Sequence, residues 1–192
     1  MMRISGIIKV FLIGVKFTKY LYFRRKLVHL GMIEKRIQIA YLSYDLNELP
    51  AEFHQLVEKA KEAAQDAYAP YSNFKVGAAV LLDNGLIFKG NNQENAAYPS
   101  GLCAERVALF YANANYPKSA ITQIAITAYN DAGMVDTPVA PCGSCRQVLL
   151  ETENRFHSSM KVILVAAQGI YVFSSAADLL PNSFDASFLK SK

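Results

Sequence analysis

Hydrophobic residues along the chain follow two kinds of pattern. From Ala51 to Ala67 they recur at helical spacing, and Pro70 then ends the segment. Residues 75–82 and 121–128 are typical of strands, and 160–167 form a continuous apolar run that predicts a buried strand. Each of two tight turns precedes a predicted returning strand: Asp83-Asn84-Gly85 before 86–90, and Gln168-Gly169 before 170–173.

Three further segments predict helices, over 103–114, 142–153 and, in the tail, 177–180. Helices alternating with strands predict a layered α/β domain with a mixed sheet of about five strands. Because Gln168-Gly169 is too short for a parallel crossover, the last two strands must be antiparallel.

Charge divides the chain unevenly. The net charge is +4, yet seven of the 20 Lys and Arg and none of the 16 Asp and Glu lie in residues 1–31. The 13 basic and 16 acidic residues of 32–192 therefore give −3, which offers no basic track for nucleic acid.

The basic, acid-free segment 1–31 matches no common targeting signal. Its lysines interrupt the apolar residues, so it lacks the roughly 20 apolar residues of a membrane-spanning helix. No secretory signal core with a cleavage site is present either. We expect a disordered extension, or sequence upstream of a true start near Met32, with association at a membrane surface as the alternative. Residues 32–50 then form an irregular lead and 51–192 the working domain.

The three cysteines lie at two predicted helix starts. Cys142 and Cys145 are three residues apart, which places both sulfurs on one helical face, and Cys103 opens the other helix. A helix N-terminus favours the thiolate that binds metal. Three cysteines are too few, and odd in number, for a disulfide framework, and they indicate a reducing compartment or a metal. If both N-termini meet, the thiolates form a zinc site whose fourth position is open to water, as in catalytic sites.

Glu105 follows Cys103 by two residues and is the natural general acid and base beside that water. The combination of x-E with P-C-x-x-C is typical of zinc deaminases. Because three thiolates make the site negative, we expect Arg106, Arg146 or both to donate hydrogen bonds to sulfur. The alternatives are buried structural cysteines, or a closed zinc site. A closed site would need a histidine as fourth ligand, and His29, His54 and His157 show no spacing that suggests convergence.

Several motifs occur together from about residue 51 to 188. They are Tyr68-Ala-Pro-Tyr71-Ser-Asn-Phe74-Lys-Val76-Gly77-Ala-Ala79, Gly90-Asn-Asn92-Gln-Glu94-Asn95-Ala-Ala-Tyr98, Cys103-Ala-Glu105-Arg106 and Pro141-Cys-Gly-Ser-Cys145-Arg-Gln147. In these motifs the chain resembles the small, single-domain, homotetrameric cytidine deaminases with three cysteine ligands. The resemblance implies a three-layer α/β/α fold, one Zn²⁺ per subunit, and a homotetramer with active sites near subunit interfaces.

The resemblance also implies residue roles. Phe74 would pack against a nucleoside, Asn92 and Glu94 would bind the ribose hydroxyls, and the backbone of Ala104 would contact the pyrimidine edge. Phe184 would reach a neighbouring subunit's base, and Gln147 would support the metal ligands together with the arginines. From the residues alone, Asn92 and Glu94 also fit a loop-stabilising network. Phe184 likewise fits a core anchor for the tail.

The reaction implied by the resemblance is deamination of cytidine and deoxycytidine to uridine and deoxyuridine plus ammonia, in cytoplasmic pyrimidine salvage. This implies a small-molecule partner, with no nucleic acid and no membrane. Three alternatives compete: deamination of an aminoacyl-nucleoside antibiotic, deamination of a base within nucleic acid, and a non-catalytic zinc module. The charge of −3 and the antiparallel last strands argue against nucleic acid, and Glu105 argues against the module.

Overall fold

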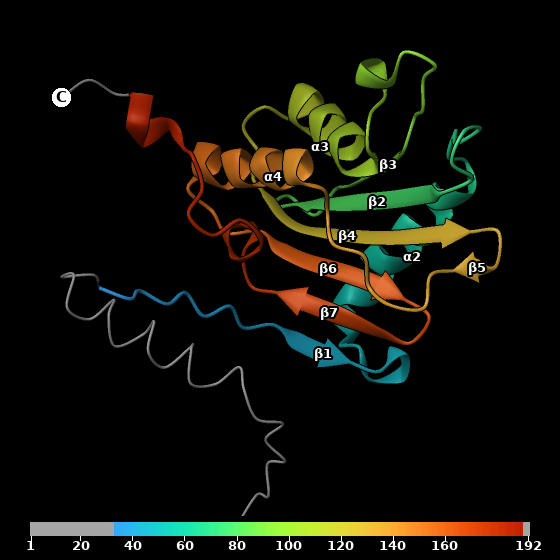
Figure 1. The fold of residues 1–192 in the computed structure, drawn as a ribbon, viewed down its shortest axis with the longest axis horizontal. Coiled ribbons are helices and arrows are strands. Elements are labelled where there is room, and N and C mark those ends of the chain that lie inside the picture. The colour runs from blue at the N-terminus through green and yellow to red at the C-terminus, as the bar shows by residue number, and fades with distance from the viewer. Residues whose placement is uncertain (1–32, 190–192) are drawn as a thin grey trace, which may run out of the picture. The chain divides into compact units, whose positions relative to one another are not determined.

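A computed structural model describes residues 33–189 of the chain (Figure 1). The chain divides after residue 38 into two compact units. In the first, residues 33–38 form no helix or strand. The second contains all the elements described below. The extension predicted over 1–31 lies outside the described residues.

One mixed sheet forms the centre of the second unit (Figure 1). In the described part of the chain it has seven strands, in the order β1-β7-β6-β4-β2-β3, with β5 paired to β4. The strands are β1 (Leu42–Tyr44), β2 (Lys75–Leu82), β3 (Ile87–Asn91), β4 (Ile121–Asn130), β5 (Gly133–Met134), β6 (Lys161–Ala166) and β7 (Gly169–Phe173).

The prediction of about five strands was too low. The additional strands are β1 and β5, which have three and two residues, too few for a hydrophobic period to be recognised. Strand β1 pairs with the edge of β7 from within the predicted N-terminal lead. The prediction that the last two strands are antiparallel is confirmed by the β6–β7 pairing, whereas β4 and β6 are parallel.

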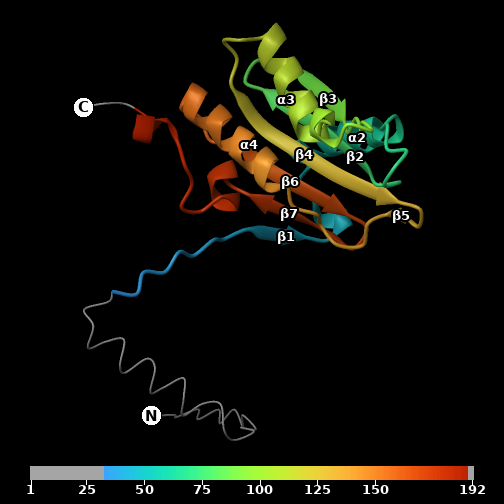
Figure 2. The same cartoon turned by 45° about the horizontal axis from the view of Figure 1, so that its top comes forward.

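Helices cover both faces of the sheet, which confirms the three-layer α/β/α fold (Figure 2). Helix α2 (Ala51–Gln65) covers one face, and α3 (Ala104–Asn115) and α4 (Gly143–Phe156) cover the other. Alternation along β2 explains this, because Ala78 and Val80 pack in the core on the α3 side and Ala79 packs on the α2 side. A short 3-10 helix over Ala176–Leu179 occupies the predicted position of the tail helix. Within residues 33–189, no helix has the length and apolar character needed to cross a membrane.

Two glycines let the helices approach the sheet closely. A Cβ at Gly77 would lie 2.1 Å from the carbonyl oxygen of Ala60 in α2. A Cβ at Gly90 would lie 2.3 Å from the backbone nitrogen of Ala108 and 2.7 Å from the carbonyl oxygen of Ala104 in α3. The position of α3, and therefore of the residues at its start, depends on a backbone contact that only glycine allows.

Candidate functional site

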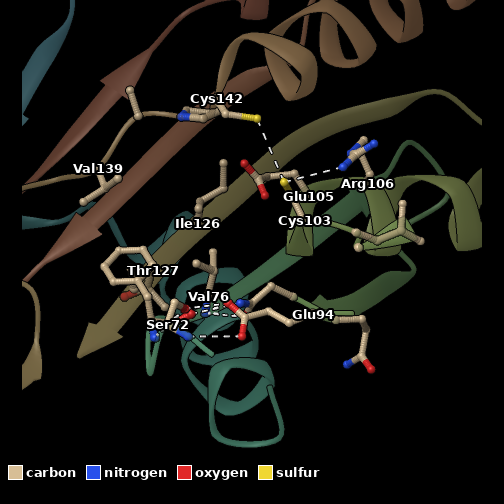
Figure 3. A pocket seen from close by; sticks show the side chains of 18 of the residues that line it. Ser72, Val76, Glu94, Cys103, Glu105, Arg106, Ile126, Thr127, Val139 and Cys142 are labelled. Atoms are coloured by element: carbon tan, nitrogen blue, oxygen red, sulfur yellow. Dashed lines mark hydrogen bonds between the residues drawn. The ribbon is translucent and has the colours of Figure 1, made fainter. Parts of the chain in front are cut away.

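The three cysteines converge where α3 and α4 begin. Figure 3 shows the side chains of Cys103 and Cys142 pointing toward one another. Cys103 and Cys142 are the residues immediately before the two helices, and Cys145 lies within the first turn of α4. All three sulfur atoms lie within 4.8 Å of one another, and the Sγ atoms of Cys103 and Cys142 are 3.9 Å apart. The two helix starts therefore meet, as a three-thiolate site requires.

This arrangement fits a zinc ion. With Zn–S bonds of about 2.3 Å in a tetrahedral site, two ligand sulfurs lie about 3.8 Å apart, close to the separation of Cys103 and Cys142. No described histidine joins the group. The ring of His54 hydrogen-bonds the carbonyl oxygen of Leu49, and His157 lies at the opposite end of α4 from Cys142, while His29 lies outside the described residues.

The thiols share their protons unequally. The pKa of Cys103 is lowered to about 5, mainly because the Cys145 thiol donates a hydrogen bond to it, with further stabilisation of the thiolate by Arg106 and Cys142. The same interaction raises the pKa of Cys145. The surroundings of Cys103 therefore favour its thiolate form, which is the form that binds a cation.

The two arginines proposed as partners of the thiolates lie in different surroundings. The Nη2 atom of Arg106 is 3.7 Å from the sulfur of Cys103, and this contact raises the pKa of the guanidinium. Arg146 instead donates from Nε to the carbonyl oxygen of Pro141 at 2.7 Å and from Nη1 to that of Leu179 at 3.0 Å. Arg106 therefore lies beside a sulfur, whereas Arg146 links the chain before α4 to the tail.

Glu105 enters the site from the first turn of α3. Its side chain lines the same cavity as Cys103 and Cys142, and the residue is only 5% exposed. Burial raises the pKa of its carboxyl group, and the nearby Cys103 charge raises it further. A buried carboxyl group in the cavity beside the cysteines can accept a proton and donate it again.

The cavity at the cysteines has a volume of about 490 Å³. Phe74, Asn92 and Glu94 lie in its wall together with Glu105. The wall is completed by residues without a predicted role, among them Ser72, Val76, Tyr98, Ile126, Thr127, Val139 and Val165. Such a volume is within the range of small-molecule sites. Ala104 lies behind the wall, fully buried at the start of α3.

Asn92 and Glu94 also stabilise the loop before β2. The Asn92 side chain accepts a hydrogen bond from the Val76 amide at 2.7 Å and donates one to the Phe74 carbonyl oxygen at 2.9 Å. Glu94 accepts from the amides of Tyr71 and Ser72 and from the Ser72 hydroxyl. The loop-stabilising network considered for this pair is therefore present, and both residues also line the cavity.

Two other residues with predicted roles lie outside the cavity wall. Phe184 is 57% exposed and stacks on Phe188, with ring centroids 5.7 Å apart. The side chain of Gln147 donates from Nε2 to the Phe184 carbonyl oxygen at 2.9 Å, which ties α4 to the tail. Phe184 is thus held by its backbone, with its ring presented to solvent.

Ser72 has no role predicted from the sequence, although it lies within the motif of residues 68–79. Its hydroxyl lies between the Phe74 amide and the Glu94 carboxylate. A serine two residues before the amide that it accepts from is typical of a tight turn, and this local signal could have marked it.

The chain is similar to proteins of one family. Residues 51–160 match the family described as "Cytidine and deoxycytidylate deaminase zinc-binding region". The chain is 41% identical over 130 residues to a cytidine deaminase of Sporosarcina psychrophila, which covers 68% of this chain and 89% of the relative. It is 40% identical over 131 residues to one of Halalkalibacterium halodurans, with coverage of 68% and 92%.

Among solved structures, the cytidine deaminase of Burkholderia pseudomallei is similar to the chain with a TM-score of 0.59 and 45% identity. The match covers 68% of this chain and 98% of that one. The chain therefore belongs to the family of cytidine and deoxycytidylate deaminases.

Proposed function

We propose that the protein catalyses the hydrolytic deamination of cytidine and deoxycytidine to uridine and deoxyuridine, with release of ammonia. The observation that carries the proposal is a buried carboxyl group, Glu105, in one cavity with a three-cysteine cluster. The names of the similar proteins support the same reaction.

Cys103, Cys142 and Cys145 would hold one Zn²⁺ per subunit. Such an ion lowers the pKa of a water that it binds, and so supplies a nucleophile at neutral pH. Glu105 would accept a proton from the attacking water and deliver it to N3. It would then accept the second proton from the hydroxyl now on C4 and deliver it to the departing amino group, so that its own charge is restored when ammonia leaves. The Ala104 backbone and the Phe74 ring orient the base.

The sugar would be recognised at the opposite wall of the cavity. Glu94 has acceptor capacity left after its three hydrogen bonds, and Asn92 keeps one N–H, so the pair can bind ribose hydroxyls while stabilising the loop. A free nucleoside fits better than a base within nucleic acid, since residues 32–192 carry a net charge of −3. An aminoacyl-nucleoside substrate would undergo the same chemistry, so only an assay with such a compound can distinguish it from cytidine.

We further propose a homotetramer with active sites near subunit interfaces, in which the exposed Phe184 ring reaches a neighbouring subunit. The free thiols suit the reducing cytoplasm, where the reaction would serve pyrimidine salvage.

The test is an assay of the purified, zinc-loaded protein with cytidine and deoxycytidine, followed by the loss of cytosine absorbance. Glu105→Gln should lower kcat by about 100-fold or more while zinc is retained, because general acid and base catalysis contributes at least that much. Glu151→Gln, an exposed substitution on α4 with the same charge change, is the control and should be fully active. A wild-type protein silent on both nucleosides would refute the proposal.

A further inference from the structure

A tight loop before β2 contributes to the cavity wall. It carries Phe74, which lines the cavity, and the residues that donate hydrogen bonds to Glu94. Asn73 has a positive φ of 54°, and its amide donates to the Ala69 carbonyl oxygen at 3.1 Å. This left-handed residue turns the chain between Ser72 and Phe74. The loop is therefore a defined turn whose side-chain contacts can be assigned individually.

One hydroxyl group links both walls of the cavity. The Oγ of Ser72 accepts a hydrogen bond from the Phe74 amide at 3.0 Å and donates one to Oε1 of Glu94 at 2.5 Å. Each partner also has another role in the proposed site, since the Phe74 ring and the Glu94 carboxylate line the cavity. A rotation of either partner would break a bond to the same oxygen.

The hydrogen bonds of Glu94 are distributed unequally over its two oxygens. Oε2 accepts from two backbone amides, those of Tyr71 at 2.9 Å and Ser72 at 3.3 Å. Among residues 33–189, Oε1 accepts only from the Ser72 hydroxyl, so a second lone pair of Oε1 is available for a ligand. Ser72 also makes the largest contribution to lowering the pKa of Glu94, which keeps the carboxylate ionised and a strong acceptor.

We propose that Ser72 is a positioning residue for sugar recognition, whose hydroxyl directs the Glu94 carboxylate toward the sugar hydroxyls of a bound nucleoside. This inference rests on the proposed function. It predicts that loss of the hydroxyl weakens binding only when the ligand has sugar hydroxyls for Glu94 to accept from.

The experiment measures dissociation constants by calorimetry in the Glu105→Gln background, where the ligand is not consumed. The probes are cytidine and 2′,3′-dideoxycytidine, which lacks both hydroxyls. Ser72→Ala should weaken cytidine binding about tenfold, as expected for one hydrogen bond to a charged group, and should change dideoxycytidine binding less than about twofold. Ser72→Thr keeps the hydroxyl and should bind cytidine within about twofold of the parent protein. Ser119→Ala, which removes a hydroxyl that accepts from Asn84 at the hairpin, is the matched control.

A purely structural serine would give a different result. Ser72→Ala would then weaken both ligands equally or neither, and this outcome would overturn the inference. Failure of the parent protein to bind cytidine would overturn it as well. If the binding pattern holds but the wild-type protein does not turn over cytidine, the inference stands and the proposed reaction fails.

Discussion

At the scale of single residues, Arg106 allows the electrostatic support of the cysteine cluster to be tested separately from the packing around it. Its guanidinium lies 3.7 Å from the Cys103 sulfur. By withdrawing charge from a thiolate that would ligate zinc, Arg106 would make the site less negative and strengthen the Lewis acidity that the ion supplies. Arg106→Ala should therefore lower kcat by about tenfold or more with zinc content unchanged, since loss of such supporting partners costs about 10–100-fold. Steady-state kinetics and metal analysis measure both quantities.

Arg146 provides a control of the same residue type. It contacts the carbonyl oxygens of Pro141 and Leu179 rather than a sulfur. Arg146→Ala should lower the melting temperature more than Arg106→Ala does and should affect kcat less, because its bonds tie the chain to the tail. Equal kinetics of wild-type protein and Arg106→Ala would reject the electrostatic role of Arg106.

The role of a single residue can be predicted from the sequence where local spacing determines its position. It cannot be predicted where contacts between distant parts of the chain determine it. Cys103, Glu105 and the Cys142–Cys145 pair follow from helix-start positions and spacing. The spacing did not reveal which arginine faces sulfur, because Arg106 and Arg146 each follow a motif residue directly. The tertiary contact of Arg146 with Leu179, far along the chain, decides this.

At the scale of elements, the contact between β3 and α3 sets the position of Cys103 and Glu105. A Cβ at Gly90 would collide with backbone atoms of Ala104 and Ala108, which cannot rotate away as a side chain could. Gly90→Ala should lower the free energy of unfolding by about 1–3 kcal/mol, the usual cost of overpacking. It should also lower kcat, because α3 must shift with the residues at its start.

Urea unfolding of the two variants Gly90→Ala and Gly143→Ala tests this. Nothing lies within 4 Å of a Cβ at Gly143, the first residue of α4. Gly143→Ala should thus be neutral or stabilise by up to about 1 kcal/mol through the unfolded chain. If Gly90→Ala unfolded at the same urea midpoint as the wild-type protein, α3 would accommodate the added Cβ and the contact would not require glycine.

The elements themselves were mostly predictable, since long periodic segments determine α2, β2, β4 and β6. Strands β1 and β5 were not, because each depends on the hydrogen bonds of an existing neighbour, β7 and β4 respectively. A strand of two or three residues has no pattern of its own and forms only where a sheet edge is already present.

At the scale of the whole molecule, charge and structure divide the chain at nearly the same place. The seven basic residues of 1–31 precede every described element, and the strands and the cavity wall lie between residues 42 and 173. If the working domain needs only these elements, a variant comprising residues 32–192 should keep the wild-type melting temperature and kcat within about twofold, since it retains every described strand and helix. Its charge of −3 should also abolish any salt-sensitive retention of the full chain on single-stranded DNA.

Sedimentation of both proteins measures assembly at the same time: tetramers in both would place the subunit contacts within 32–192. A truncated protein that unfolds, or that loses activity while remaining folded, would instead assign the basic segment a part in the enzyme.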